Sequence, residues 1–234
     1  MRITEMNWMQ VEQYLQTDDR CIVPIGSTEQ HGYLSLGVDL ILADRVANEA
    51  AGPLGVPVFP VMPYGIAPYF ADYPGTVSLK VETLLAVVRD VIASVHRSGF
   101  QRILVVNGHG GNQPVAGLAG DMMVEHPRLS IKFHSWWNAP RTWAKVQEID
   151  PSGSHANWME NFPWTRLADV AVPRDIKGGF DRELMRASPP AGVREILGDG
   201  SFGGEYQKLD EVMLDLWRMG VEETRAQLEG PWPV

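Results

Sequence analysis

The sequence predicts an α/β fold, and three observations support that prediction. Short runs rich in β-branched residues alternate with longer stretches whose apolar residues recur at helical spacing. Hydrophobic residues make up 44% of the 234 positions and charged residues 21%, which is typical of a chain that buries a sizeable core. No internal repeat and no second composition regime interrupts the chain. We therefore expect a single domain over residues 1–234.

Strands are predicted wherever a short apolar run ends at turn residues. CIVPIG at 21–26 and RILVVN at 102–107 are the clearest buried strands, and LSIKFHSW at 129–136 is a third. VPVFPV at 56–61 is a weaker candidate, because its two prolines favour an edge or an irregular end. DVAVP at 169–173 is a candidate for a final strand.

Helices are predicted between and after these strands, over about 39–51, 80–98 and 114–125. Another helix is expected to begin near Ser154, which would act as its N-cap. The segment 174–207 is rich in Gly, Pro and charge, and we interpret it as a long functional or interface loop. The apolar stripe of an amphipathic terminal helix follows it: Leu209, Val212, Met213, Leu216, Trp217 and Val221.

Charge, apolar content and cysteine use narrow the class of protein. Lys plus Arg number 20 and Asp plus Glu 29, and the net charge of −9 argues against binding to a nucleic-acid backbone. No stretch approaches the ~18 apolar residues of a membrane span, and the first residues lack a signal-peptide layout. The single Cys21 cannot form an internal disulfide and is interpreted as a small buried apolar residue. We expect a cytoplasmic protein without a nucleic-acid or membrane partner.

Two loops that follow buried strands carry side chains of the kind that bind metal ions. Glu29 and His31 flank one residue, so in an extended segment both side chains point the same way. Asp39 follows, and His109 lies among glycines after the second strand. Converging carboxylates and imidazoles are ligands for Zn²⁺, Mn²⁺ or Fe²⁺. The plainer interpretations are a surface Glu–His pair and a histidine in a glycine turn, and a phosphate loop is disfavoured because NGHGGN lacks the P-loop lysine.

Several motifs together resemble the creatininase (creatinine amidohydrolase) family. They are PIGSTEQHG-(x6)-D, PYG-(x8)-PGTVSL, NGHGGN, SHANWMEN and GDGSFGG, and they extend over about residues 20–205. The resemblance implies a single three-layer α/β/α domain with a mainly parallel central sheet. It also implies an active site with two divalent metal ions (Zn²⁺, Mn²⁺ or Fe²⁺), hydrolysis of C–N bonds in amides, and a homohexamer.

The resemblance also implies roles for individual residues. Four positions match metal ligands of the family: Glu29, His31, Asp39 and His109. Asp39 matches the bridging carboxylate, His155 the histidine near the scissile bond, and Glu160 the glutamate five residues later. In this scheme a metal-activated water attacks the amide carbon, the metals polarise the carbonyl, and His155 donates a proton to the leaving nitrogen.

The sequence departs from the family pattern at three places. The loop after His31 is one residue shorter than is common and lacks a second histidine, which leaves Asp44 as a weaker alternative to Asp39. Gly111 stands where creatininase has a glutamate ligand, and Trp158 stands where many relatives have glutamate. Creatinine is therefore not the favoured substrate.

These departures leave the second metal site one ligand short. His31 and Asp39 alone are too few, so we expect Glu160 to be the third protein ligand as well as a catalytic residue. Alternatively, Glu160 orients His31 or His155 through a hydrogen bond. On an ideal helix, residues five apart point about 140° from one another, so His155 would have to lie in the first turn of a helix beginning at Ser154.

The sequence therefore predicts a dinuclear metal-dependent amidohydrolase that cleaves a C–N bond of a small cyclic amide, lactam or formamide. Two alternatives stay open: a metal-dependent hydrolase of another bond, such as a phosphoester, and a catalytically silent, oligomeric binding relative. Five of the eight tryptophans either pack in the core or wall a pocket for a flat heterocycle. They are Trp136, Trp137, Trp143, Trp158 and Trp164.

Overall fold

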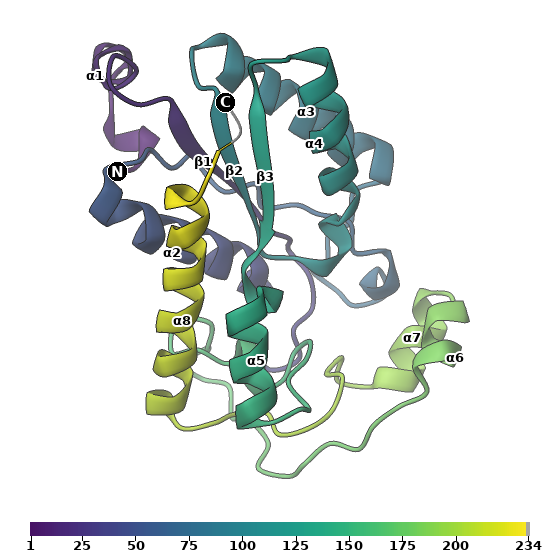
Figure 1. Cartoon of the computed structure of the whole chain (residues 1–234). Helices are drawn as coiled ribbons and strands as arrows, with labels where there is room; N and C mark the ends of the chain where they lie inside the picture. Colours follow the sequence, from purple (N-terminus) through teal and green to yellow (C-terminus); the bar gives the residue numbers. More distant parts are fainter. Residues whose placement is uncertain (233–234) are drawn as a thin grey trace.

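A parallel sheet of three strands lies at the centre of the computed structural model, which describes residues 1–232 (Figure 1). Its strands are β1 (Arg20–Ile25), β2 (Arg102–Asn107) and β3 (Ser130–Ser135), in the order β1-β2-β3. Neighbouring strands pair in parallel along their full length. The α/β class and the parallel sheet predicted from the sequence are therefore confirmed.

The segment over 56–62 runs beside β1 without forming a regular strand. The amide of Ile22 donates to the carbonyl of Pro57, and the amide of Phe59 donates back to the carbonyl of Ile22. Farther along, the amide of Met62 donates to the carbonyl of Pro24. Because prolines lack the N–H that a continuous ladder needs, the pairing is confined to isolated bridges. This agrees with the predicted irregular edge.

Eight α-helices accompany the sheet within the described residues. They are α1 (Trp8–Tyr14), α2 (Val38–Ala51), α3 (Val81–Arg97), α4 (Pro114–Glu125), α5 (Pro140–Ile149), α6 (Arg182–Ala187), α7 (Pro190–Leu197) and α8 (Asp210–Glu229). None of these helices combines the length and the apolar character needed to cross a membrane.

Helices cover both faces of the sheet, which makes the fold three-layered (Figure 1). Ile22 and Leu104 point to one face and pack in a core with α2 and α8. Val23 and Val105, their neighbours along the strands, point to the other face and pack with α3 and α4. Because alternate residues face opposite cores, β1 and β2 are apolar at nearly every position.

The chain beyond β3 differs from the sequence prediction in two places. No helix begins at Ser154, because Asn157 bonds to the carbonyls of Ser152 and Gly203 and holds the segment in a tight, non-helical loop. Residues 169–173 form no strand, because no strand of the described chain lies beside them.

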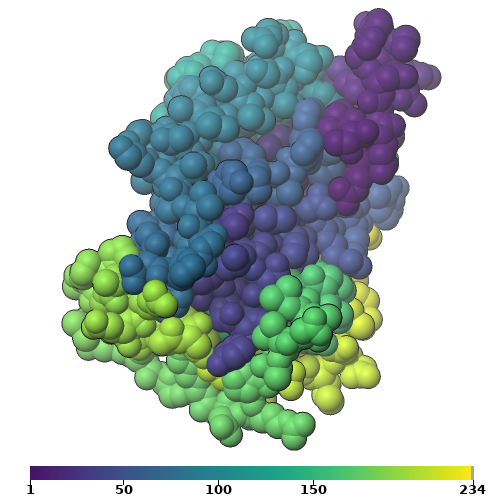
Figure 2. Space-filling view, turned by 180° about the vertical axis from the view of Figure 1, so that it is seen from behind, coloured from purple at the N-terminus to yellow at the C-terminus, as the bar shows by residue number. Residues whose placement is uncertain are grey.

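The segment 174–207 is ordered rather than an open loop, and it carries α6 and α7. These helices pack on the segment around Phe70 through Met185, Val193 and Leu197. Figure 2 shows them projecting as a lobe beside the residues around 65–80. Since parallel strands end at the same edge of the sheet, the loops after β1 and β2 meet, and this lobe lies beside them (Figure 1).

Candidate metal centre

Five acidic and histidine side chains predicted as metal ligands converge beyond the carboxyl ends of β1 and β2. Glu29 and His31 come from the loop after β1, Asp39 from the first turn of α2, and His109 from the loop after β2. Glu160 reaches the same place from the segment beyond α5. All are buried except Glu160, whose side chain is 20% exposed.

Glu29, Asp39 and His109 form one group of donor atoms. Nδ1 of His109 lies 2.9 Å from Oδ2 of Asp39 and 3.3 Å from Oε1 of Glu29. The opposite ring nitrogen, Nε2, donates to the carbonyl of Ile66 at 2.9 Å. Such a bond leaves Nδ1 as the nitrogen that a metal ion could bind in place of a proton, which is the usual support for a metal-binding histidine.

His31, Asp39 and Glu160 form a second group. Nε2 of His31 lies 3.2 Å from Oδ1 of Asp39 and 3.7 Å from Oε2 of Glu160. Nδ1 of His31 donates to the carbonyl of Glu29 at 3.1 Å, so Nε2 is the nitrogen that faces the carboxylates and that a metal ion could bind in place of a proton.

Asp39 belongs to both groups and offers a different oxygen to each. Oδ1 faces His31, and Oδ2 faces His109 and accepts a hydrogen bond from Ser27 at 2.7 Å. Nε2 of His31 and Oε2 of Glu29 are buried without a hydrogen-bond partner in the described residues, which folding normally avoids. Buried imidazole nitrogens and carboxylates around one shared carboxylate are a donor set that fits two divalent cations.

The carboxylates of the cluster favour a positive charge placed between them, either a proton on a histidine or a bound cation. Burial opposes the charged form of His31, but Asp39, Glu160 and Glu29 outweigh it and raise the pKa of His31 to about 10. For Asp39, the two histidines outweigh burial and hold the pKa below its usual range. Burial, with the neighbouring carboxylates Asp39 and Glu29, raises the pKa of Glu160 to about 7. Three carboxylates packed this closely repel one another, and cations bound between them would remove this repulsion.

Gly111, where the family resemblance implies a glutamate, lies directly against atoms of the site. A Cβ atom at this position would lie 1.9 Å from the carbonyl oxygen of Ile66 and 2.6 Å from Nε2 of His109. That carbonyl is the acceptor that orients His109, so this backbone has no room for a side chain at Gly111. Trp158, at the other altered position, is fully buried in the core.

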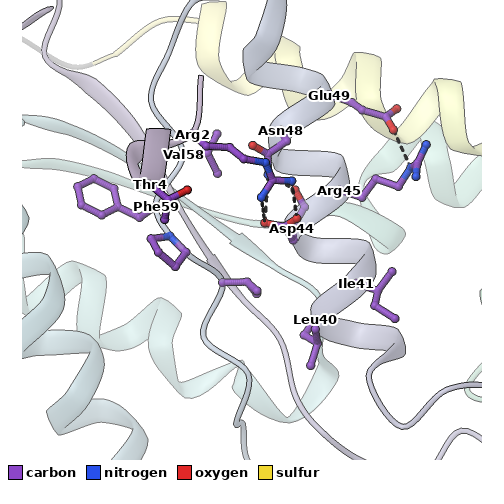
Figure 3. A pocket seen from close by; sticks show the side chains of 12 residues that line it. Arg2, Thr4, Leu40, Ile41, Asp44, Arg45, Asn48, Glu49, Val58 and Phe59 are labelled. Carbon is purple, nitrogen blue, oxygen red and sulfur yellow. Dashed lines mark hydrogen bonds and ion pairs between the residues drawn. The ribbon is translucent and has the colours of Figure 1, made fainter. Parts of the chain in front are cut away.

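Asp44, the alternative to Asp39, lies outside the cluster. It makes an ion pair with Arg2, with 2.9 Å between Nη2 and Oδ2, and accepts from Asn48. Figure 3 shows it beside Arg2 and Asn48 on the side of α2 that lines a separate surface groove. The structure thus places Asp39, and not Asp44, among the predicted ligands.

The backbone at Ala156 brings His155 and Glu160 to the same site without an α-helix, since only a single 3₁₀ turn, Trp158–Glu160, follows it. Ala156 has a φ of 56°, in the left-handed region that non-glycine residues rarely adopt. Its amide donates to Oε2 of Glu160 at 2.6 Å, closing the loop. The angle of about 140° between residues five apart on an ideal helix therefore does not keep His155 and Glu160 apart, because this segment is not an α-helix.

His155 lies at the edge of the cluster with its ring tightly held. Nδ1 is 3.7 Å from Oε1 of Glu29, and the ring stacks on Phe70 with 4.7 Å between centroids and an angle of 9°. Phe202 packs against it at 5.0 Å. Burial, together with the nearby ring of His31, lowers the pKa of His155 well below its usual value.

A cavity of about 550 Å³ opens onto the cluster and is lined by Glu29, Asp39, His109, His155 and Glu160. Its remaining walls include five aromatic side chains and two arginines: Tyr69, Phe70, Trp137, Trp143, Phe202, Arg182 and Arg186. Two of the five clustered tryptophans thus line the pocket, whereas Trp136, Trp158 and Trp164 pack in or against the core.

The sequence prediction missed most of these wall residues. Phe70 lies among the eight unspecified residues of PYG-(x8)-PGTVSL, and Phe202 lies in the loop GDGSFGG. The spacing of Arg182 and Arg186, four residues apart, is the one signal that could have indicated a shared helix face.

Comparison with known sequences identifies the family. A family model described as Creatininase, creatinine amidohydrolase, matches residues 4–222. Creatinine amidohydrolase from Pseudomonas putida is 28% identical over 165 residues, covering 64% of this chain and 63% of the relative. The 3-dehydro-scyllo-inosose hydrolase of Thermotoga maritima is 32% identical over 187 residues, covering 74% and 60%. The alignments thus span less than two thirds of either relative.

Comparison with solved structures supports the fold. A crystal structure of creatinine amidohydrolase (creatininase) matches with a TM-score of 0.82 at 22% identity, covering 98% of both chains. Related creatininase structures include a Zn–Zn form and an Mn form. At this identity the likeness concerns the fold, whereas the family model covers nearly the whole sequence. This chain belongs to the creatininase family.

Proposed function

We propose that this hydrolase uses two divalent cations to cleave the C–N bond of a small cyclic amide, lactam or formamide. The observation that carries the proposal is the position of Asp39, which faces two separate groups of donors with its two oxygens. Glu29 and His109 would complete one site, and His31 and Glu160 the other.

When bound, two such cations lower the pKa of water and polarise the carbonyl of the amide. The side chains of the protein orient the substrate beside them. His155 presents Nδ1 to the pocket as a donor to the reacting amide, and Glu160 closes the second site next to it. The aromatic walls exclude bulk water, which strengthens each of these interactions.

The walls narrow the substrate class. A cavity of about 550 Å³ suits a small molecule, and its aromatic rings suit a flat amide. Arg182 and Arg186 are exposed on one face of α6 at this cavity, and neither makes an ion pair with a carboxylate of residues 1–232. These cations favour a substrate that carries an anionic group on the side away from the metals.

A metal assay with a substrate panel tests the proposal. Purified protein is expected to hold two equivalents of zinc or manganese, and to hydrolyse a member of a panel of lactams, cyclic amides and N-formyl compounds. Each compound is offered with and without a carboxylate, and the carboxylate form is expected to react better. His109→Ala should lose at least one metal equivalent and all turnover, whereas the control His126→Ala should keep both.

Full metal occupancy and unchanged activity in His109→Ala would refute the dinuclear assignment. Protein without metal and without turnover on the panel would instead favour a catalytically silent binding relative.

The names of the relatives favour a second candidate, a metal-dependent hydrolase of another bond. Beside the inosose hydrolase, a mycofactocin precursor peptide peptidase of Mycolicibacterium smegmatis is 38% identical over 98 residues, 39% of this chain and of that protein. The panel should therefore include short peptides and cyclic polyol ketones. Turnover of these with none of the amides would replace the first candidate.

We also propose that the protein is a cytoplasmic homohexamer. The support is the resemblance of its motifs to the family.

A further inference from the structure

Gln30 lies between two of the proposed ligands, yet its side chain turns to His155. It is only 5% exposed, and its Nε2 lies 2.8 Å from Nε2 of the histidine ring. Which of the two nitrogens carries the proton between them decides what His155 can do at the site.

Two backbone groups determine which way the amide of Gln30 points. Its Oε1 accepts from the amide of Gly32 at 3.0 Å, and its Nε2 donates to the carbonyl of Gly200 at 3.1 Å. Exchanging Oε1 and Nε2 would place an oxygen against a carbonyl and an NH₂ against an N–H. The nitrogen of the amide therefore faces His155.

Gly200 makes this arrangement possible. It has a φ of 92°, and a Cβ atom there would lie 1.8 Å from Oε1 of Gln30. Only glycine allows the carbonyl of residue 200 to approach the buried amide so closely.

The orientation of the amide settles the tautomer of the histidine. An amide nitrogen only donates, so Nε2 of His155 must accept and carries no proton. The proton of the neutral ring is then on Nδ1, the atom that faces Glu29 at 3.7 Å. The stack on Phe70 and the contact with Phe202 fix the plane of the ring.

We propose that Gln30 is a positioning residue that holds His155 as the neutral tautomer with its proton on Nδ1. Although Nδ1 of His155 lies among possible ligands with Glu29 and His31, a protonated nitrogen cannot bind a metal ion.

The consequence for hydrolysis rests on the proposed function. His155 donates a hydrogen bond to the negative charge that develops on the amide and keeps its proton, as a neutral imidazole does when it acts as an electrophile. This role differs from the proton transfer to the leaving nitrogen that the family resemblance implies, and the proton that this nitrogen needs then comes from the attacking water.

Nuclear magnetic resonance of the ¹⁵N-labelled histidines tests the tautomer directly. Long-range ¹H–¹⁵N correlations distinguish Nδ1–H, Nε2–H and the doubly protonated ring, and the spectrum of His155→Asn assigns the signals. We expect a protonated Nδ1 and a bare Nε2 at neutral pH, both without metal and with zinc. A bare Nδ1, a doubly protonated ring, or an Nδ1 that loses its proton when zinc binds would overturn the proposal.

Gln30→Glu tests the cause. A carboxylate accepts where the amide donates, so the proton should move to Nε2, and Nδ1 should become sensitive to zinc. Gln16→Glu adds the same charge at an exposed position and should leave the His155 signals unchanged. If Gln30→Glu does not fold, Gln30→Met should give a mixture of tautomers.

A folded Gln30 variant in which His155 keeps a protonated Nδ1 would contradict the role of Gln30. Because none of these signals depends on turnover, the result is separate from success or failure on the substrate panel.

Discussion

Ala156 shows how one residue determines the shape of the site. It is the only non-glycine residue with a positive φ in residues 1–232, and it lies between His155 and the loop that leads to Glu160. A non-glycine residue in this conformation costs about 1–2 kcal/mol, which the surrounding contacts must offset.

Two substitutions of Ala156, to glycine and to valine, are expected to change the stability of the fold in opposite directions. Ala156→Gly should raise the free energy of unfolding by up to about 1 kcal/mol, because glycine adopts this φ without strain. The greater freedom of glycine in the unfolded chain offsets part of this gain. Ala156→Val should lower it by more than about 1 kcal/mol, since a β-branched side chain fits this region worst. Urea unfolding measures both, and equal destabilisation by the two variants would contradict the argument.

Glu160→Gln separates the two roles considered for Glu160. The new side chain can still accept from the amide of Ala156, so the loop should survive, but it is a far weaker metal ligand. We expect the loss of one metal equivalent, measured by elemental analysis. Two retained equivalents with reduced activity would show instead that Glu160 orients His31 or His155.

At the scale of elements, α5 depends on a residue far away in the sequence. Glu223 of α8 accepts from the amides of Arg141 at 3.0 Å and Thr142 at 2.8 Å, and from the hydroxyl of Thr142. The first amides of a helix have no partner within it, so this buried carboxylate caps α5 from another helix. The cap holds the helix that carries Trp143 to the pocket.

Glu223→Gln is expected to lower the free energy of unfolding by about 1–2 kcal/mol. The carboxylate accepts with both oxygens, whereas the amide of glutamine has one acceptor oxygen and carries no charge. Glu222→Gln is the matched control, since Glu222 is exposed and only pairs with Arg141 at the surface. The control should change stability by less than about 0.5 kcal/mol. Similar losses in both variants would argue against the cap.

The contact of β3 with α8 makes stability depend on pH. Nε2 of His134 donates to the hydroxyl of Thr224 at 3.0 Å, and that hydroxyl donates to the carbonyl of Gly220. Burial lowers the pKa of His134 from 6.5 to about 4, with Glu223 acting weakly in the opposite direction. Between pH 6.5 and about pH 4, His134 is therefore protonated in the unfolded chain but neutral in the native state.

Stability should therefore fall as the pH drops from 6.5 towards 4, with His134 contributing about 3 kcal/mol of the loss. In His134→Gln the fall in melting temperature over this range should be smaller than in the wild type. His126→Gln, at a partly exposed position, should follow the wild-type curve. Parallel curves for His134→Gln and the wild type would refute the assignment.

Local patterns predicted the strands and the first ligand loops, because an apolar run and the residues after it lie together in the sequence. The turn at Ala156 could not be predicted, since it depends on bonds from Asn157 to Gly203, a remote residue. The amide of Gln30 likewise depends on Gly200. The family resemblance implied the set of ligands, whereas Arg182 and Arg186 of α6, which line the cavity, lie outside every motif.

For the whole molecule, association is the property that the proposed hexamer makes testable. Large apolar side chains are exposed on several elements: Trp8 at 71%, Val124 at 83%, Ile176 at 72% and Leu209 at 74%. Single apolar side chains scattered in this way are ordinary on a protein surface, so the expectation of a hexamer rests on the family resemblance. Light scattering at micromolar concentration should give about 156 kDa, six times 26.0 kDa. A species near 26.0 kDa would refute the assembly.

The proline-containing segment beside β1 limits how copies of the chain can meet. Its inner side bonds to β1, and on its outer side Val58 exchanges backbone hydrogen bonds with the first residues of the chain, to Met1 and from Ile3. Pro57 and Pro60 offer no N–H to a further strand. The β1 edge is therefore closed to extension by a strand of another copy, which protects it from edge-to-edge aggregation. Contacts between copies on this side must be made by side chains.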